Sequence, residues 1–311
     1  MKGKVTIVGG AGRVGSNAAY ALQLGLIGEE IALVDMAESA AQGEALDLTH
    51  GRGALGGPRT VAGGYGAATG SDVVVVTAGL RRKPEESRLE LITRNANLFR
   101  QILNSLHEVE LADHAVLLVV TNPVDVLTYL AATELGWPPR RTIGLGTALD
   151  TLRFRSLLGE ELGLDPSRID AMMLGEHGDS MVPLLSAMRY DANPIQQSPN
   201  YSPEAVGRAV ERTRGAGAEC LRLKGGAGYA VGLAIRQVVE AVLTDSGATL
   251  PVATLDESGE YEGVALSRPT RVGRAGWLEY EPLTLSEEEH KGLRASAEVL
   301  KETIARLQAG T

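Results

Sequence analysis

Hydrophobic residues in the first half of the chain fall into short unbroken runs, separated by longer stretches in which they recur every three or four positions. The short runs are rich in Val, Ile and Leu, which is typical of strands buried on both faces of a parallel sheet. The longer stretches have the spacing of amphipathic helices. The runs at 5–8, 31–34, 73–77, 115–120 and 142–145 are predicted strands, and helices are predicted at 14–24, 40–48, 89–111 and 124–135. This alternation predicts a doubly wound βαβ fold.

The pattern changes after about residue 146, where strand and helix signals no longer alternate. Helices are predicted at 149–162, 203–224 and 229–244, and a last helix starts at the capping-box sequence Ser286–Glu289 and runs to about 307. Short strands are predicted at 169–174, 182–188, 252–255, 264–266, 270–272 and 278–280. We therefore expect an α/β chain with two domains: a doubly wound parallel (Rossmann) sheet at 1–145, and an α+β domain at 146–311 packed tightly on it.

A glycine-rich segment, Gly9–Gly15, joins the first predicted strand to the first predicted helix. Glycines there allow a tight turn and close approach of the backbone to a pyrophosphate, and the helix N-terminus supplies free N–H groups. A purely structural turn is the alternative. Asp35 ends the second predicted strand, where a carboxylate binds both ribose hydroxyls and repels a 2′-phosphate. This favours NAD over NADP, although Asp35 could instead cap the next helix.

The candidate chemistry centres on His177, in the segment Gly-Glu-His-Gly-Asp-Ser. Oxidation of a secondary alcohol by hydride transfer requires a base that works near neutral pH. Asp150 can hold one ring nitrogen, and Arg153, one helical turn later, suits a bidentate grip on a carboxylate. The alternatives are a structural imidazole in a tight turn and a helix-capping Asp150.

A charged segment at 81–88 follows the predicted strand 73–77. Ligands bind at the carboxyl ends of such strands, so we interpret it as a lid that brings arginines to an anionic substrate. A solvated charged loop is the alternative. Asn122 lies at the same edge, and the Asn122-Pro123 bond is a candidate for the cis form.

Composition excludes several classes of function. The net charge of −9 disfavours nucleic-acid and anionic-membrane partners. Cys220 is the only cysteine, which rules out an intrachain disulfide and argues against a thiolate metal cluster; we predict no metal. The N-terminus has no signal-peptide pattern, and the apolar runs are too short to span a bilayer. We expect a cytoplasmic protein without a membrane partner.

Together these motifs resemble the lactate/malate dehydrogenase superfamily over essentially the whole chain. The motifs that carry the resemblance are residues 10–15, Asp35, 77–79, 121–125, 149–153 and 175–179. The resemblance implies that His177 is the proton donor and acceptor, with Asp150 as its partner. Arg153 would bind the substrate's α-carboxylate, Arg88 would polarise the reacting carbonyl, and Asn122 would hydrogen-bond in the site. The implied NAD contacts are Gly10, Ala11, Gly12, Arg13, Val14, Gly15, Asp35, Thr77, Ala78, Gly79, Asn95, Val120 and Asn122.

Arg82 decides the expected substrate. Lactate enzymes of the superfamily usually place Gln at this position and malate enzymes place Arg, which balances the second carboxylate of oxaloacetate. Leaving such a buried charge unpaired would cost roughly 3–5 kcal/mol. Ala227 and residues 180–184 also look like those of malate enzymes, and Asp170 stands where enzymes activated by sugar phosphates have His.

We therefore expect an NAD-dependent malate dehydrogenase of the tricarboxylic acid cycle, closest to the lactate-dehydrogenase-like malate dehydrogenases of bacteria and archaea. Its partner would be a small dicarboxylate, malate or oxaloacetate, and the resemblance implies a homotetramer or homodimer. The alternative is an L-lactate dehydrogenase or another 2-hydroxy acid dehydrogenase, favoured by the lactate-like Glu86-Ser87. A more remote alternative is a silent NAD-binding protein, for which a positioned proton relay would have no use.

Overall fold

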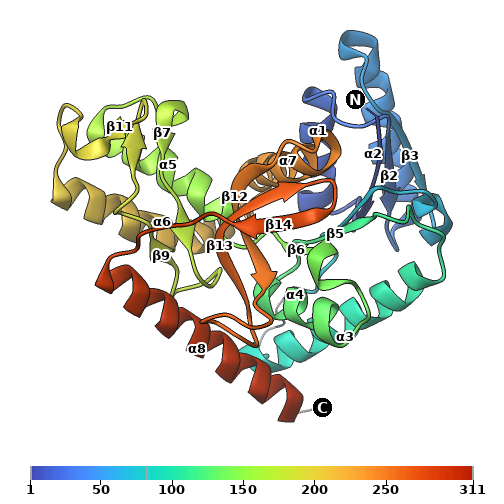
Figure 1. Ribbon diagram of the computed structural model, residues 1–311. Coiled ribbons are helices and arrows are strands. Elements are labelled where there is room, and N and C mark those ends of the chain that lie inside the picture. The colour runs from blue at the N-terminus through green and yellow to red at the C-terminus, as the bar shows by residue number, and fades with distance from the viewer. Residues whose placement is uncertain (1, 82, 84, 310–311) are drawn as a thin grey trace.

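The computed structural model describes residues 2–81, 83 and 85–309, and its centre is a nine-stranded sheet (Figure 1). Six strands are parallel and lie in the order β3-β2-β1-β4-β5-β6, which is the predicted doubly wound arrangement. These strands are β1 (Lys4–Val8), β2 (Glu30–Val34), β3 (Arg59–Gly63), β4 (Val73–Val76), β5 (Val116–Val119) and β6 (Thr142–Gly144). The order reverses between β1 and β4, and the crevice at such a switch point is where ligands bind.

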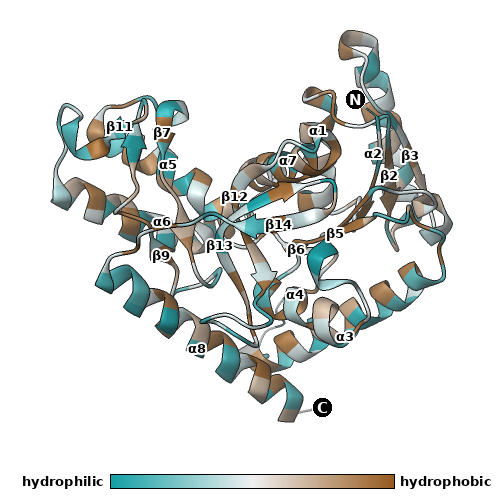
Figure 2. Ribbon diagram, in the orientation of Figure 1, coloured by the Kyte–Doolittle hydropathy of each residue, from teal (hydrophilic) through white to brown (hydrophobic). Residues whose placement is uncertain are grey.

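Helices cover both faces of the parallel strands. Successive residues of each strand point to opposite faces, so an unbroken run of apolar residues must be buried on both. In β4, Val74 and Val76 pack in one core cluster and Val73 and Val75 in the other. The first cluster contains residues of α3 (Arg88–His107), α4 (Val124–Thr133) and α8 (Glu287–Ala309). The second contains residues of α1 (Arg13–Leu24), α2 (Glu38–Leu55) and α7 (Tyr229–Thr244). Figure 2 shows the hydropathy that goes with this arrangement: the buried strand β5 is largely hydrophobic, whereas the covering helix α8 alternates between hydrophobic and hydrophilic residues.

The second half of the chain extends the same sheet instead of forming a separate one. Strands β12 (Ala248–Leu255), β13 (Ala265–Gly273) and β14 (Gly276–Tyr280) are antiparallel, and β12 pairs with β6 where Ala253 lies opposite Gly144. Helices α5 (Ala148–Leu162) and α6 (Pro203–Lys224) enclose a third core cluster around Phe154 and Leu158. Since one sheet contains strands of both halves, the division at residue 145 stays a prediction.

Several predicted strands differ from the observed ones. The strand predicted at 169–174 is wrong: it is split into β7 (Ile169–Asp170) and β8 (Met173–Leu174), which belong to different sheets. Side chains of α5 bind the backbone there, because Arg155 donates to the Ala171 carbonyl and Thr151 accepts from the Met173 amide. Only β9 (Val182–Pro183) forms within 182–188, where Leu185 and Met188 instead donate to turn carbonyls.

Three further differences are smaller. The predictions at 264–266 and 270–272 are parts of one strand, β13, and β3 was not predicted. The short strands β10 (Arg189–Tyr190) and β11 (Asn193–Pro194) pair beside β7.

The predicted capping box is confirmed, because the Ser286 amide donates to the Glu289 carboxylate (2.7 Å) and the Glu289 amide to the Ser286 hydroxyl (3.2 Å). None of the helices among the described residues is long and apolar enough to cross a membrane.

Candidate active site

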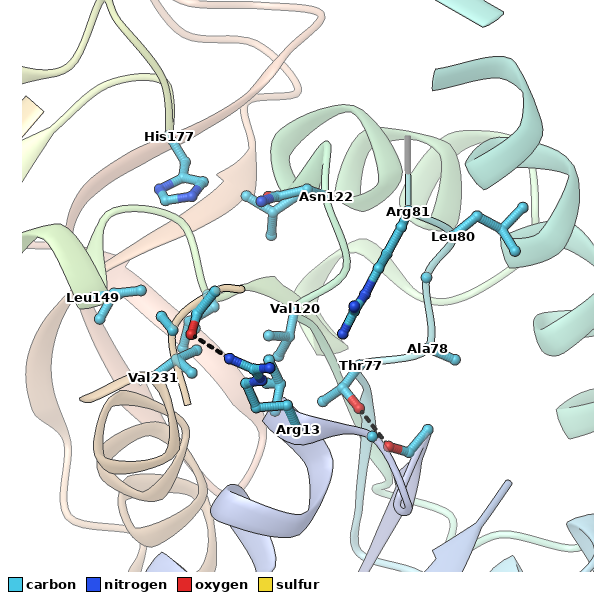
Figure 3. A pocket seen from close by; sticks show the side chains of 18 of the residues that line it. Arg13, Thr77, Ala78, Leu80, Arg81, Val120, Asn122, Leu149, His177 and Val231 are labelled. Carbon is cyan, nitrogen blue, oxygen red and sulfur yellow. Dashed lines mark hydrogen bonds between the residues drawn. The ribbon is translucent and has the colours of Figure 1, made fainter. Parts of the chain in front are cut away.

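A single cavity of about 930 Å³ runs from the carboxyl ends of the parallel strands into the second half of the chain. It brings together residues that are far apart in the sequence: Asp35, Asn122, Asp150 and His177 all line it. The other predicted site residues that line it are Gly12, Arg13, Val14, Thr77, Ala78, Gly79, Val120, Arg153 and Ala227. Figure 3 shows His177 and Asn122 facing the same space as Thr77 and Val120.

The glycine loop forms the nucleotide end of this cavity. Gly9 has φ +89°, and a Cβ on Gly15 would lie 2.2 Å from the Gly9 carbonyl oxygen, so no other residue fits the close packing of loop and helix. A Cβ on Gly10 would meet Leu33 at 2.8 Å. Gly10, Ala11 and Gly15 do not line the cavity; Gly10 and Gly15 shape the loop, and Gly12 precedes α1 at the cavity wall. A loop that requires glycine at positions 9, 10 and 15, beside a free helix N-terminus, fits a dinucleotide pyrophosphate.

Backbone contacts fix the orientation of the Asp35 carboxylate, which suits a residue that binds ribose hydroxyls. Its two carboxylate oxygens accept the backbone N–H groups of Ala11 (3.0 Å) and Ala37 (2.9 Å). Helix α2 begins at Glu38, so the Ala37 amide that Asp35 binds belongs to the residue just before the helix, and the ribose contact stays a prediction. Each oxygen keeps a second lone pair for a ribose hydroxyl.

His177 lies in the loop between β8 and β9, and its Nδ1 is 2.5 Å from Oδ2 of Asp150. Asp150, in the first turn of α5, is only 1 % exposed, and its Oδ1 accepts a hydrogen bond from Arg153 (2.9 Å). Burial acts to raise the pKa of Asp150, but the imidazole and the guanidinium outweigh it and hold that pKa below its ordinary value. Burial likewise acts to lower the pKa of His177, but the Asp150 carboxylate outweighs it and raises that pKa. Because Nδ1 faces Asp150, Nε2 is the nitrogen that can reach a substrate.

The cis form of the Asn122-Pro123 bond is confirmed. The Asn95 side chain donates a hydrogen bond to the backbone carbonyl of Asn122 (3.1 Å) and so fixes its position. Asn95 also accepts the Leu80 amide (2.7 Å) and does not line the cavity, so it joins two segments of the cavity wall.

Sequence reasoning missed Asp125 here, and the structure adds detail for two other residues. Arg81 belongs to the charged segment that was expected to bring arginines to the substrate, and Figure 3 shows its side chain pointing into the cavity. Asp125 was read only as a motif member; it is buried and accepts the backbone N–H of His177 (2.7 Å). Arg13, expected at the cofactor, lines the cavity, and its guanidinium donates to the carbonyls of Lys224 and Gly226 at the end of α6; its contact with NAD stays a prediction.

Two predicted site residues cannot be placed. Arg82 lies outside the described residues, as does the side chain of Arg88, whose backbone begins α3. Glu86 contacts Arg94 (2.5 Å) and accepts the Lys83 amide. Glu85 has φ +66°, a conformation that glycine adopts more easily.

Comparison with known proteins agrees with this geometry. The family model for the NAD-binding domain of lactate/malate dehydrogenases matches residues 3–144, and the model for their alpha/beta C-terminal domain matches 147–310. The L-lactate dehydrogenase of Synechococcus sp. (strain JA-3-3Ab) is 40% identical over 98% of each chain, and that of Salinibacter ruber is 41% identical over 97% of each. The solved structure of the minor L-lactate dehydrogenase from Enterococcus mundtii has a TM-score of 0.91, 32% identity and 98% coverage of both chains.

These relatives overturn the expected substrate. The prediction of a malate dehydrogenase of the tricarboxylic acid cycle, with a dicarboxylate partner, is wrong, because whole-length relatives in sequence and in structure are lactate dehydrogenases. The prediction depended mainly on the charge of one residue, Arg82, whereas the similarity covers the sheet, the cavity and the histidine loop together. The chain belongs to the lactate/malate dehydrogenase family and is an oxidoreductase with NAD as its cofactor.

Proposed function

We propose that the protein is an L-lactate dehydrogenase that interconverts L-lactate and pyruvate. The observation that carries the proposal is the buried chain of contacts from His177 to Asp150 to Arg153 at the wall of the nucleotide cavity. The whole-length similarity to L-lactate dehydrogenases supports the choice of substrate.

The residues fit the reduction of a 2-oxo acid. Arg153 lines the cavity and offers a planar fork for the substrate carboxylate. That contact places the keto oxygen toward Nε2 of His177. When bound, the nicotinamide supplies the hydride to the keto carbon.

His177 donates its proton to the keto oxygen as negative charge develops there. Asp150 favours the protonated ring before the transfer and fixes the tautomer after it. In lactate oxidation, neutral His177 removes the hydroxyl proton. The family resemblance assigns carbonyl polarisation to Arg88 and a further hydrogen bond to Asn122.

A substrate panel tests the proposal directly. Purified protein is assayed with pyruvate, oxaloacetate and a bulkier 2-oxo acid, each with NADH and with NADPH. We expect the highest kcat/KM with pyruvate and NADH. A kcat/KM at least about tenfold higher for oxaloacetate, equivalent to 1.4 kcal/mol, would refute the lactate assignment.

A matched variant separates catalysis from cofactor binding. His177→Asn should reduce turnover by at least about 10³-fold, because it removes the proton donor, while NADH affinity stays within about twofold. If the wild-type protein turns over no substrate of the panel but binds NADH, the L-lactate assignment fails, and another 2-hydroxy acid or a silent NAD-binding role is favoured. The homotetramer or homodimer stays a prediction, which analytical ultracentrifugation tests.

A further inference from the structure

Asp125 is a buried carboxyl group to which the proposed mechanism gives no task. It lies in the first turn of α4, and its side chain is 3 % exposed. Its Oδ2 accepts the backbone N–H of His177 at 2.7 Å. Its Oδ1 is buried and has no hydrogen-bond partner among the described residues. A carboxylate buried with one hydrogen bond is costly unless a nearby charge compensates it.

The charges around Asp125 leave few groups that could compensate it. Within the described part of the chain no ion pair includes Asp125, and Arg153 is engaged with Asp150. Glu176, which follows β8, is also buried and accepts the Ser180 hydroxyl (2.5 Å). The charged groups that act on Asp125 and His177 are Asp150 and Arg153 from α5 and Glu176 from the histidine loop. The other titratable groups that line the same cavity are Arg13, Asp35, Glu38, Tyr65, Arg81, Asp179 and Arg214.

The compensating charge is therefore the one that His177 itself can acquire. Asp125 and Asp150 approach the histidine from different sides, since Asp125 binds its backbone amide and Asp150 its ring. A protonated ring is attracted by both carboxyl groups.

We propose that Asp125 is a positioning residue for His177, which anchors the histidine's backbone and favours its protonated ring through a buried negative charge. The proposal extends the function proposed above. Burial raises the pKa of Asp125 to about 7, although the hydrogen bond from His177 opposes this. Asp125 therefore changes protonation near neutral pH, and its protonation is coupled to that of the imidazole. A proton on the ring favours the Asp125 carboxylate, and a neutral ring favours the protonated carboxyl group.

The variant Asp125→Asn separates the backbone hydrogen bond from the negative charge. Its amide oxygen can still accept the His177 N–H but carries no charge. We would measure kcat/KM for reduction across pH with saturating NADH, using whichever 2-oxo acid the wild-type protein reduces fastest. At low pH we expect rates within about twofold of wild type. At about pH 8.5 the variant should be roughly tenfold slower, because lowering the pKa of the ring by one reduces its protonated fraction tenfold.

Glu289→Gln is the matched control. Glu289 is another buried carboxylate, bound to Ser186 and Ser286, and it does not line the cavity. Its pH profile should coincide with that of wild type. If Asp125→Asn does not fold, Asp125→Ser also keeps an oxygen acceptor and is measured in its place.

Two outcomes would overturn the proposal. One is a profile of the Asp125 variant that coincides with wild type; the other is an equal loss at every pH with NADH binding intact. Nuclear magnetic resonance of the labelled His177 ring gives a readout without turnover, and its pKa should be lower in the variant. This measurement holds even if the wild-type protein reduces no 2-oxo acid, so a failure of the proposed function is distinguishable from a failure of this inference.

Discussion

Replacing Asp150 by Asn tests the proposed proton relay most directly. The Asp150 carboxylate lies 2.5 Å from Nδ1 of His177 and is almost fully buried. An Asn side chain has the same shape and can still accept a hydrogen bond from the ring, so the variant removes mainly the charge. Arg153 loses its anionic partner at the same time.

The size of the effect follows from Coulomb's law. A 2.5 Å contact between the two side chains places their charge centres about 4 Å apart, and an effective dielectric constant of about 20 then gives roughly 4 kcal/mol. That energy corresponds to a change of about 10³ in the protonated fraction of the ring at neutral pH. Arg153 already neutralises part of the carboxylate, so we expect kcat/KM for pyruvate reduction to fall about 10²-fold to 10³-fold.

The assay is pyruvate reduction followed by NADH absorbance between about pH 5 and pH 9, the range around the ordinary pKa of histidine. Activity should partly return toward low pH, where the ring is protonated without help. NADH affinity, measured by fluorescence, should change by less than about twofold, because Asp35 and the glycine loop are untouched. A kcat/KM at pH 7 within about threefold of wild type would refute the argument that Asp150 sustains the charged ring.

Three other changes test the cofactor site and the buried charges. Asp35→Ser should raise the ratio of kcat/KM for NADPH to that for NADH at least about tenfold, since the carboxylate that repels a 2′-phosphate is gone; an unchanged ratio would contradict the ribose assignment. Asp256→Asn should lower the free energy of unfolding by about 3–5 kcal/mol in urea titrations, because it leaves the largely buried Arg268, 3.3 Å away, without its anion; Arg268→Met should cost less. Since burial raises the pKa of Asp125 from 3.8 to about 7, its contribution to stability is complete below about pH 4 and is lost as the pH rises to 7. The free energy of unfolding of Asp125→Asn relative to wild type, measured by thermal unfolding, should therefore increase over that pH window by up to roughly 4 kcal/mol.

The parallel strands could be predicted because they are buried on both faces. In β4 and β5 each residue packs in one of the two core clusters, and this produces the unbroken apolar runs in the sequence. Strand β3 gives no such signal, because only Thr60 is buried and the strand runs from Arg59 to Gly63. The segment 169–174 is apolar because Ile169, Ala171 and Met173 pack in the third core cluster, whereas side chains of α5 bind part of its backbone and interrupt the strand.

The centre of the site could also be predicted, but not everything around it. His177, Asp150 and Arg153 stand in recognisable local sequences, and Asp150 and Arg153 share one helix. Asp125 meets His177 only through a backbone contact between residues 52 positions apart, which no local pattern shows. The Arg13 guanidinium binds carbonyls at the end of α6, and that contact between distant parts of the chain gives no local signal either.

The contact between Ala253 and Gly144 limits how this protein could be recombined with its relatives. A Cβ on Gly144 would lie 3.1 Å from that of Ala253 and 2.3 Å from the Thr128 hydroxyl. A chimera that takes its nucleotide-binding half from one parent and its histidine loop from another would join the parents inside the sheet and not at a flexible linker. Such a chimera should fold well only when the parents have equally small residues at this seam, so crossovers would be chosen by matching these two positions first.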